Sequence, residues 1–435
     1  MPGSEPAGAG GLPPGRMALL FMVMLITAAG NTAMQSVMPS IGAHLGIADV
    51  WVSLAYSWSA LLWMLLAPYW ARRSDRSGRK AMMALGLTGF ALSFALCGAA
   101  LLAGLHGLVT GIQAILLFAL ARTLYGAFGS AAPPAVQAYV AGRTSRARRT
   151  RALSVVASSF GLGTALGPAV APMLIVPGIG LVGPFAAFTL GALGVLAVLH
   201  WRLPDDAPAR LPDTPYAQAF GEHADGWPGN TQDDDPAPAR LRWGDRRIRT
   251  WLIAGALGGQ AQSMLLGVIG FMLLDRLGLR HHADDAAGPI ALVLMCGALA
   301  MLLAQWGLIP MLGLGPRMST MLGMALVVVG TVPVATGHQL QTIASGFAMA
   351  SAGFGLFRPG FIAGTSLAVA PGEQGGAAGI VAAINGSAYI VSPAIAVWLY
   401  NRAHETVWLL IEALALIVVI MLWRSKSLGL PDPAA

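Results

Sequence analysis

The sequence ARRSDRSGRK, at residues 71–80, separates two long apolar runs: WVSLAYSWSALLWMLLAPYW at 51–70 and AMMALGLTGFALSFALCGAALL at 81–102. Each run has about the 20 apolar residues needed to cross roughly 30 Å of hydrocarbon, and neither contains a charge. The segment between them holds five basic side chains and one carboxylate. We therefore expect a short polar link in water, at one membrane face, between two helices that span the bilayer.

The composition indicates a membrane protein with many spans. Of the 435 residues, 56% are hydrophobic and only 10% are charged, whereas roughly 25% are charged in an ordinary soluble domain. The apolar residues recur in long blocks and do not alternate as they would in a transmembrane β-barrel. We predict an all-α membrane protein with twelve spans, at 17–38, 51–70, 81–104, 112–140, 152–176, 181–201, 250–274, 289–312, 319–337, 341–369, 377–399 and 406–423.

The basic residues predict the orientation of these spans. If the N-terminus is cytoplasmic, the inner segments hold 21 arginines and lysines and the outer loops hold three. Inner loops are the ones that carry an excess of basic residues. Both termini are therefore predicted to lie in the cytoplasm, in the inner membrane of a bacterium, and the net charge of +7 follows from topology.

The longest interruption, at 202–249, divides the spans into two sets of six and has the composition of a solvated linker. Four residues of the first set recur at one constant offset in the second, which supports an internal repeat; the pairs are Gln35 and Gln260, Pro134 and Pro359, Gly161 and Gly386, and Pro168 and Pro393. The predicted organisation is a disordered N-terminus at 1–16, a six-helix bundle at 17–201, a cytoplasmic linker at 202–249, a second six-helix bundle at 250–423 and a cytoplasmic tail at 424–435.

The polar link resembles the loop between spans 2 and 3 of the major facilitator superfamily. Its residues Asp75, Arg76, Gly78 and Arg79 follow that loop's D-R-x-G-R spacing, with Ala71 where glycine is usual. Gly78 would permit a sharp turn, and Asp75 could pair with an arginine or a helix N-terminus. The resemblance implies a set of contacts that break and reform between transport states. The alternative is a basic loop that only sets topology.

A second motif lies in the fourth predicted span, where Arg122 precedes Tyr125 and Gly126. It resembles the R-x-x-x-G element of the same superfamily. An arginine within the bilayer costs at least about 2.5–3.5 kcal/mol, so a role in handling substrate or protons is favoured. The alternative is an arginine that bonds backbone carbonyls for packing alone.

A third motif lies in the fifth predicted span, at Gly163, Gly167 and Pro168. It resembles the G-x-x-x-G-P element of drug:proton antiporters, although Ala171 and Pro172 stand where two glycines close that element. Small residues four apart allow close approach of helices, and proline bends a helix. The resemblance favours export over import, while plain helix packing is the alternative.

Arg358 is the main departure from the exporter pattern, because it places a second positive charge inside the bundle. Two buried guanidinium groups need a negatively charged partner, which the substrate could supply. Alternatively, Arg358 forms hydrogen bonds with the backbone carbonyls that Pro359 leaves without a donor. Acidic residues in the spans are few. Glu412 and Asp275 are the candidates for carrying a proton.

Other polar and aromatic residues in the spans could line a central cavity, although each could equally hold two helices together. Tyr56 and Trp58 could stack on a planar ligand. The remaining candidates for substrate binding are Asn31, Gln35, Tyr125, Gln137, Gln260, Gln262, Asn385 and Tyr389.

The sequence has no enzyme signature, no P-loop and no metal-ligand spacing, so no cofactor or metal is expected. We predict a monomeric secondary active transporter that exports a small organic compound by proton-coupled antiport. An anion such as a carboxylate metabolite or siderophore is the preferred substrate class. An organic-anion uptake symporter is the first alternative. The second is a membrane receptor or lipid-handling protein that uses the same fold without transport.

Overall fold

The computed structural model describes residues 12–144, 146–176, 178–204, 244–369 and 373–425. Most of the predicted N-terminal segment, linker and tail lies outside these ranges. The first half of the described chain contains α1 (Pro14–His44), α2 (Asp49–Ser77), α3 (Arg79–Leu105), α4 (Gly111–Phe128), η1 (Gly129–Ala131), α5 (Ala132–Gly142), α6 (Arg146–Val170), η2 (Ala171–Leu174) and α7 (Gly183–Arg202). The second half contains α9 (Arg246–Arg276), η3 (Leu279–His281), α10 (Ala283–Leu303), η4 (Ala304–Leu308), α11 (Ile309–Leu312), α12 (Pro316–Thr336), α13 (Leu340–Leu367), α14 (Gln374–Arg402) and α15 (Thr406–Arg424).

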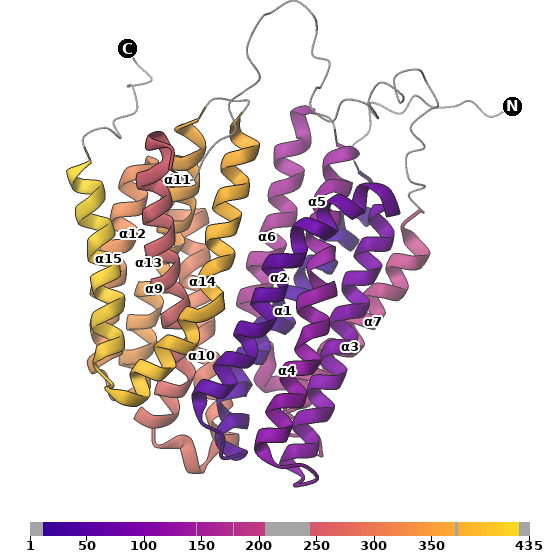
Figure 1. Ribbon diagram of the computed structural model, residues 1–435, viewed down its shortest axis with the longest axis vertical. Coiled ribbons are helices and arrows are strands. Elements are labelled where there is room, and N and C mark those ends of the chain that lie inside the picture. The colour runs from indigo at the N-terminus through magenta and orange to yellow at the C-terminus, as the bar shows by residue number, and fades with distance from the viewer. Residues whose placement is uncertain (1–11, 145, 177, 205–243, 370–372, 426–435) are drawn as a thin grey trace, which may run out of the picture.

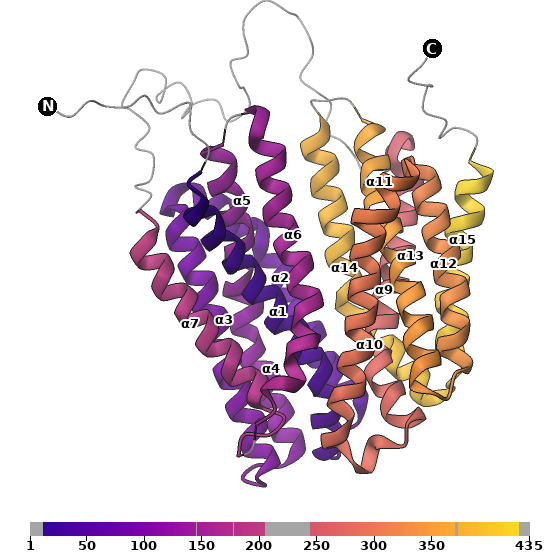
Figure 2. The ribbon, with the colours of Figure 1, turned by 180° about the vertical axis from the view of Figure 1, so that it is seen from behind.

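The helices form two groups side by side, α1 to α7 and α9 to α15 (Figures 1 and 2). Helix α1 begins, and α15 ends, at the same face of the molecule, which is at the top of both views and is called here the terminal face. The two groups lie closest to each other near the opposite face, where α1 and α2 meet the elements from α9 to α10. Contacts between the groups come from the pairs α2 with α14, α1 with α10 and α6 with α10.

The all-helical membrane fold is confirmed. Eleven of the described helices are long and apolar enough to cross a membrane. Twelve spans were predicted. The predicted fifth span corresponds to α6, which is 25 residues long and packs against α1 but is not one of these eleven helices.

The polar link is shorter than the sequence predicts. Helix α2 continues to Ser77 and α3 begins at Arg79, so Gly78 alone separates them. Gly78 has φ of +88°, a conformation that costs glycine little and other residues much. The prediction of a ten-residue link was wrong because Arg and Ser do not end a helix: their polar ends can extend into water while the backbone stays helical.

Prolines account for the other differences from the predicted spans. The span predicted at 112–140 is divided by the 3₁₀ turn η1, and the pair Pro133 and Pro134 follows in the first turn of α5. Proline is tolerated in the first turn because its missing N–H has no partner there in any helix. In the same way, Pro172 lies in η2 after α6 ends at Val170.

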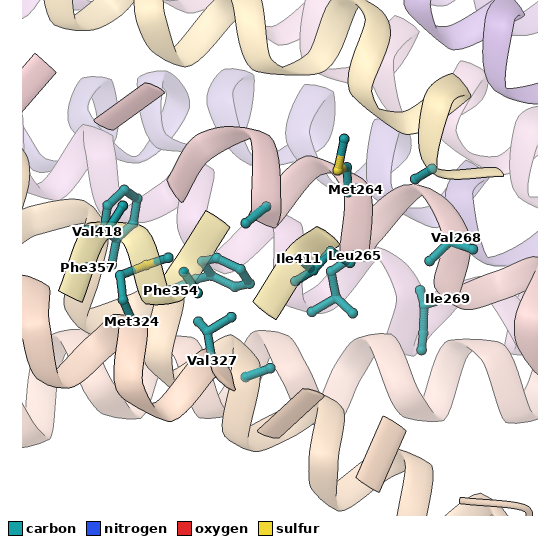
Figure 3. Close-up of a cluster of buried hydrophobic side chains, with 14 of the residues drawn as sticks. Met264, Leu265, Val268, Ile269, Met324, Val327, Phe354, Phe357, Ile411 and Val418 are labelled. Carbon is teal, nitrogen blue, oxygen red and sulfur yellow. The ribbon is translucent and has the colours of Figure 1, made fainter. Parts of the chain in front are cut away.

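The second half is held together by a continuous apolar core. Figure 3 shows its centre, where α9 contributes Met264, Leu265, Val268 and Ile269. The same close-up shows the facing residues of α12, α13 and α15, which are Met324, Val327, Phe354, Phe357, Ile411 and Val418. In a bilayer such packing stabilises by close contact, since lipid is as apolar as the side chains.

Glycines bring helices together in both halves. A Cβ atom at Gly330 of α12 would lie 2.8 Å from the carbonyl oxygen of Gly346 in α13. In the first half, a Cβ atom at Gly163 of α6 would lie 2.7 Å from the carbonyl oxygen of Leu25 in α1. Thr32 of α1 also donates a hydrogen bond to the Gly163 carbonyl, at 3.4 Å. The predicted packing role of the third motif therefore has a direct geometric basis.

Candidate functional site

Arg122 lies in the interior of the first half, and its side chain is only 2% exposed. It extends from α4 toward α1 and α2. Its Nη2 group donates to Oδ1 of Asn31 at 3.1 Å and to Oγ of Ser59 at 2.9 Å. Both of these partners are neutral, so the guanidinium charge is not matched by a carboxylate among its hydrogen-bond acceptors.

Two nitrogens of the Arg122 guanidinium have no acceptor. Nε and Nη1 are buried and make no hydrogen bond among the described residues, and the hydroxyl of the nearby Tyr56 is in the same condition. Buried donors are almost always paired in folded proteins, because an unpaired one costs about 1–3 kcal/mol and a charged one more. The free side of this guanidinium is therefore a candidate for binding an anion.

Gly126 explains why Arg122 can reach Ser59. It lies one helical turn after Arg122, and a Cβ atom there would be 2.6 Å from the carbonyl oxygen of Ser59. Any larger residue would push α4 away from α2 at the level of the arginine. The R-x-x-x-G spacing thus couples the charge to the close approach that supplies one of its partners.

Aromatic rings surround the same guanidinium. The carbon at its centre lies 4.5 Å from the centre of the Tyr125 ring and 5.6 Å from that of Tyr56. Ring faces stabilise a cation that has few other partners. Trp58 lies on the same stretch of α2, and its Nε1 donates to Oγ1 of Thr123 at 2.9 Å while much of its ring stays exposed. The structure thus brings together Asn31, Tyr56, Arg122 and Tyr125 from the predicted set.

The other predicted lining residues are distributed over both halves. Gln35 lies one turn after Asn31 on α1 and is half-buried. Gln260 of α9 accepts a hydrogen bond from Ser392 of α14, so this pair joins two helices of the second half. Of the remaining predicted residues, Asn385 and Tyr389 are half-buried on α14, Gln262 is buried on α9, and Gln137 is exposed on α5.

Arg358 and Glu412 stand apart from the Arg122 site. Arg358 is half-buried on α13, in the other half of the molecule, and Glu412 is half-buried on α15. Within the described part of the chain, neither side chain has a hydrogen-bond or ion-pair partner. The carbonyls freed by Pro359 therefore do not bind Arg358. Two predicted charges remain unmatched in the second half.

Asp275, in contrast, belongs to a charged cluster at the face opposite the terminal face. Arg280 donates to Asp275 through Nε, and through Nη2 at 3.2 Å. It also donates to both carboxylate oxygens of Asp49, at 2.6 and 3.2 Å. The hydrogen bonds to Asp275 and Asp49 raise the pKa of Arg280 above its ordinary value. We call Asp49, Asp275 and Arg280 the outer ion cluster.

The terminal face has its own polar contacts. Lys80 of α3 donates to the His200 carbonyl of α7 at 3.1 Å, and Arg247 pairs with Asp245 and Glu373. Gly78 and Arg79 form the α2–α3 junction described above. The side chains of Asp75 and Arg76 lie outside the described residues. Among the side chains that are described, no three His, Cys, Asp or Glu groups gather as a metal site.

Ser59, Asp49 and Arg280 were missing from the predicted site. Ser59 could have been suspected, because polar residues within a span pair with a nearby intramembrane charge. Asp49 and Arg280 are 231 residues apart in sequence, and neither lies within a predicted span. Their pairing depends on how the two halves meet, which no local signal contains.

Two sequence relatives of the chain are named multidrug resistance proteins. The chain is 29% identical over 163 residues to Multidrug resistance protein 2 of Bacillus subtilis (strain 168), a match over 38% of this chain and 37% of the relative. It is 28% identical over 154 residues to Multidrug resistance protein MdtG of Proteus mirabilis (strain HI4320), over 34% and 35% of the two chains. The match therefore spans about a third of the length of these relatives.

Solved transporters share the fold. A D-xylose-proton symporter superposes with a TM-score of 0.70 at 16% identity, over 94% of this chain and 97% of the other. The human organic anion transporter MFSD10 (TETRAN) does so with a TM-score of 0.63 at 20% identity, over 94% and 100%. The Major Facilitator Superfamily family model matches residues 20–313, which is more than half of the chain. The chain therefore belongs to the Major Facilitator Superfamily of membrane transporters.

Proposed function

We propose that this transporter exports a small organic anion from the bacterial cytoplasm in exchange for protons. The negative charge of the substrate is inferred from the Arg122 guanidinium, which is buried among neutral partners and has two nitrogens, Nε and Nη1, without an acceptor among the described residues. A carboxylate can accept two parallel hydrogen bonds from an arginine. Arg358, which has no partner among the described residues either, is the second candidate contact for a negative group.

Export is supported by the names of the sequence relatives and by the resemblance of the third motif to the element of drug:proton antiporters. Both relatives are called multidrug resistance proteins. The motif's Gly163 lets α6 pack directly on the α1 backbone. In transporters built from paired bundles, the binding site lies between them and the bundles rock around it. We take 17–201 and 250–423 as these bundles, with one substrate site per monomer.

The orientation follows from the basic residues. The terminal face is assigned to the cytoplasm, because α1 begins and α15 ends there and the distribution of basic residues in the sequence predicts cytoplasmic termini. The halves diverge at this face and meet at the other (Figures 1 and 2). This arrangement corresponds to the inward-facing state of alternating access.

Glu412 is the preferred proton carrier, since its carboxylate has no partner in the described chain. Asp275 is committed to Arg280. Replacing Glu412 with Gln should abolish gradient-driven transport but leave exchange of substrate for substrate intact. Glu405→Gln is the matched control, because Glu405 is exposed just before the same helix begins.

Everted membrane vesicles with an imposed proton gradient test the proposal directly. They should accumulate organic anions in preference to neutral and cationic compounds of similar size, and an uncoupler should prevent it. Accumulation only in right-side-out vesicles would indicate uptake. Binding without gradient-dependent flux would indicate a receptor or lipid-handling protein.

A further inference from the structure

The outer ion cluster joins the two halves of the molecule. Asp49 is the first residue of α2, in the first half. Asp275 is the second-last residue of α9 and Arg280 lies in η3, both in the second half. Asp49 is only 3% exposed, although it stands at the end of a helix that faces water. Its two oxygens are both held by Arg280, at 2.6 and 3.2 Å.

Apolar contacts seal the same region. Phe271 of α9, Ala287 of α10 and Val397 of α14 belong to one buried cluster with residues of α1 and α2. Gly270 also allows close approach, because a Cβ atom there would lie 2.6 Å from Cγ of Pro39 in α1. The charged pair therefore lies at the rim of a closed, close-packed contact between the halves.

We propose that the Asp49–Arg280 pair is the outer gate contact of the transport cycle, which must break before substrate can pass the face opposite the terminal face. The inference rests on the proposed alternating access. It assigns a role in transport to two residues outside the superfamily motifs of this sequence.

Asp275 makes the two sides of this contact unequal, because it gives Arg280 a second carboxylate partner within the same half. When the halves separate, Arg280 keeps Asp275 as a partner within its own half, and only Asp49 loses its ion pair. The separated state therefore contains no unpaired arginine, and Asp49 moves from burial into water. A buried pair that loses one partner is strongly destabilised, whereas this arrangement lets the contact open without leaving a buried charge behind.

The contact can be tested without any substrate, so the result does not depend on the proposed function. Spin labels would be attached at Leu108→Cys and Gln339→Cys, two exposed positions of the opposite face, one in each half. The native Cys97 and Cys296 would be replaced by Ala. Double electron–electron resonance in lipid nanodiscs then reports the distance between the halves at this face, as the ratio of separated to joined molecules.

Asp49→Asn should raise this ratio at least about tenfold, since it removes the charge that holds Arg280. Arg280→Gln should raise it further, because Asp49 and Asp275 then face each other without a cation. The double variant should return toward the Asp49→Asn value, as it removes one of the two repelling charges.

Asp285→Asn is the matched control. Asp285 is exposed at the same face and has no ion-pair partner in the described chain, so its neutralisation should leave the ratio unchanged. A ratio within about twofold of the parent's in both Asp49→Asn and Arg280→Gln, in protein that elutes as a single folded species, would overturn the proposal. A variant that fails to fold is replaced by Asp49→Glu, which keeps the charge and should retain the joined form.

Discussion

Arg122 and Arg280 differ in the partners that the protein provides for their positive charges. Arg280 lies at one face of the molecule and has two carboxylate partners, one from each half. Arg122 lies in the interior; among the described residues its hydrogen-bond acceptors are only an amide and a hydroxyl, and two of its nitrogens have no acceptor. A cation neutralised by the protein can hold two parts together. A cation that the protein leaves unmatched is available to a ligand, and this difference separates the proposed gate from the proposed binding site.

The largest expected effect comes from removing the close approach that gives Arg122 its Ser59 partner. Gly126→Leu should lower the initial transport rate by about 100-fold, because displacing α4 from α2 misplaces the binding group. Gly194→Leu is the control, since a Cβ atom at Gly194 meets nothing within 4 Å. Transport assays in vesicles measure both. Equal rates for the two variants would show that the α4–α2 contact does not position Arg122.

A smaller effect is expected from removing one neutral partner of Arg122. Ser59→Ala should lower the free energy of unfolding by about 1–2 kcal/mol, because a hydrogen bond to a buried charge is lost. SDS titration of the purified protein measures this. Ser57→Ala is the control on the same helix: Ser57 is also buried, but its hydroxyl bonds only the Ser53 carbonyl. If both substitutions cost the same, Ser59 does not stabilise the charge.

A third arginine sharpens the comparison, because Arg247 also has two carboxylate partners but lies in water. Asp245, one of these partners, caps α9 through the Arg247 N–H at 2.9 Å. Hydrogen bonds from the side chain and backbone of Arg247 lower the pKa of Asp245 below its ordinary value of 3.8. The stabilisation is therefore complete above that ordinary value and is lost as the pH falls through the lower, folded-state value.

Hydrogen exchange of the first turn of α9 checks this smallest effect. After correction for intrinsic rates, protection should fall below about pH 4 in the parent chain and should be reduced already at neutral pH in Asp245→Ala, which removes the capping oxygen. High salt should weaken it, since exposed pairs are screened. Protection that is independent of both pH and the substitution would contradict the capping role of Asp245.

The sequence predicted what is local and missed what depends on assembly. Long apolar runs predict helices of bilayer length. An arginine within such a run is easily recognised, so the position of Arg122 inside a span could be inferred. Asn31 was included because polar residues in spans are rare. Ser59 could be suspected as a polar residue in a span, but the sequence does not say which of the serines in α2 contacts Arg122, because that depends on the close approach of α4 and α2 at Gly126.

Two predictions about position failed or remained open for physical reasons. The boundary of α2 was placed too early, since basic residues can continue a helix out of the membrane and only Gly78 ends it. Arg358 was grouped with Arg122 because both lie in spans. The structure places them in different halves, and whether they share a ligand stays a prediction.

Relative affinity for an anion and its neutral analogue tests the central claim most directly. Isothermal titration would compare an aromatic carboxylate with its carboxamide in the parent protein and in Arg122→Gln. We expect the parent protein to bind the carboxylate at least about tenfold more tightly than the carboxamide, and Arg122→Gln to lose this preference while it still binds the carboxamide. A preference for the carboxylate that persists unchanged in Arg122→Gln would contradict the assignment of Arg122 as the anion-binding group.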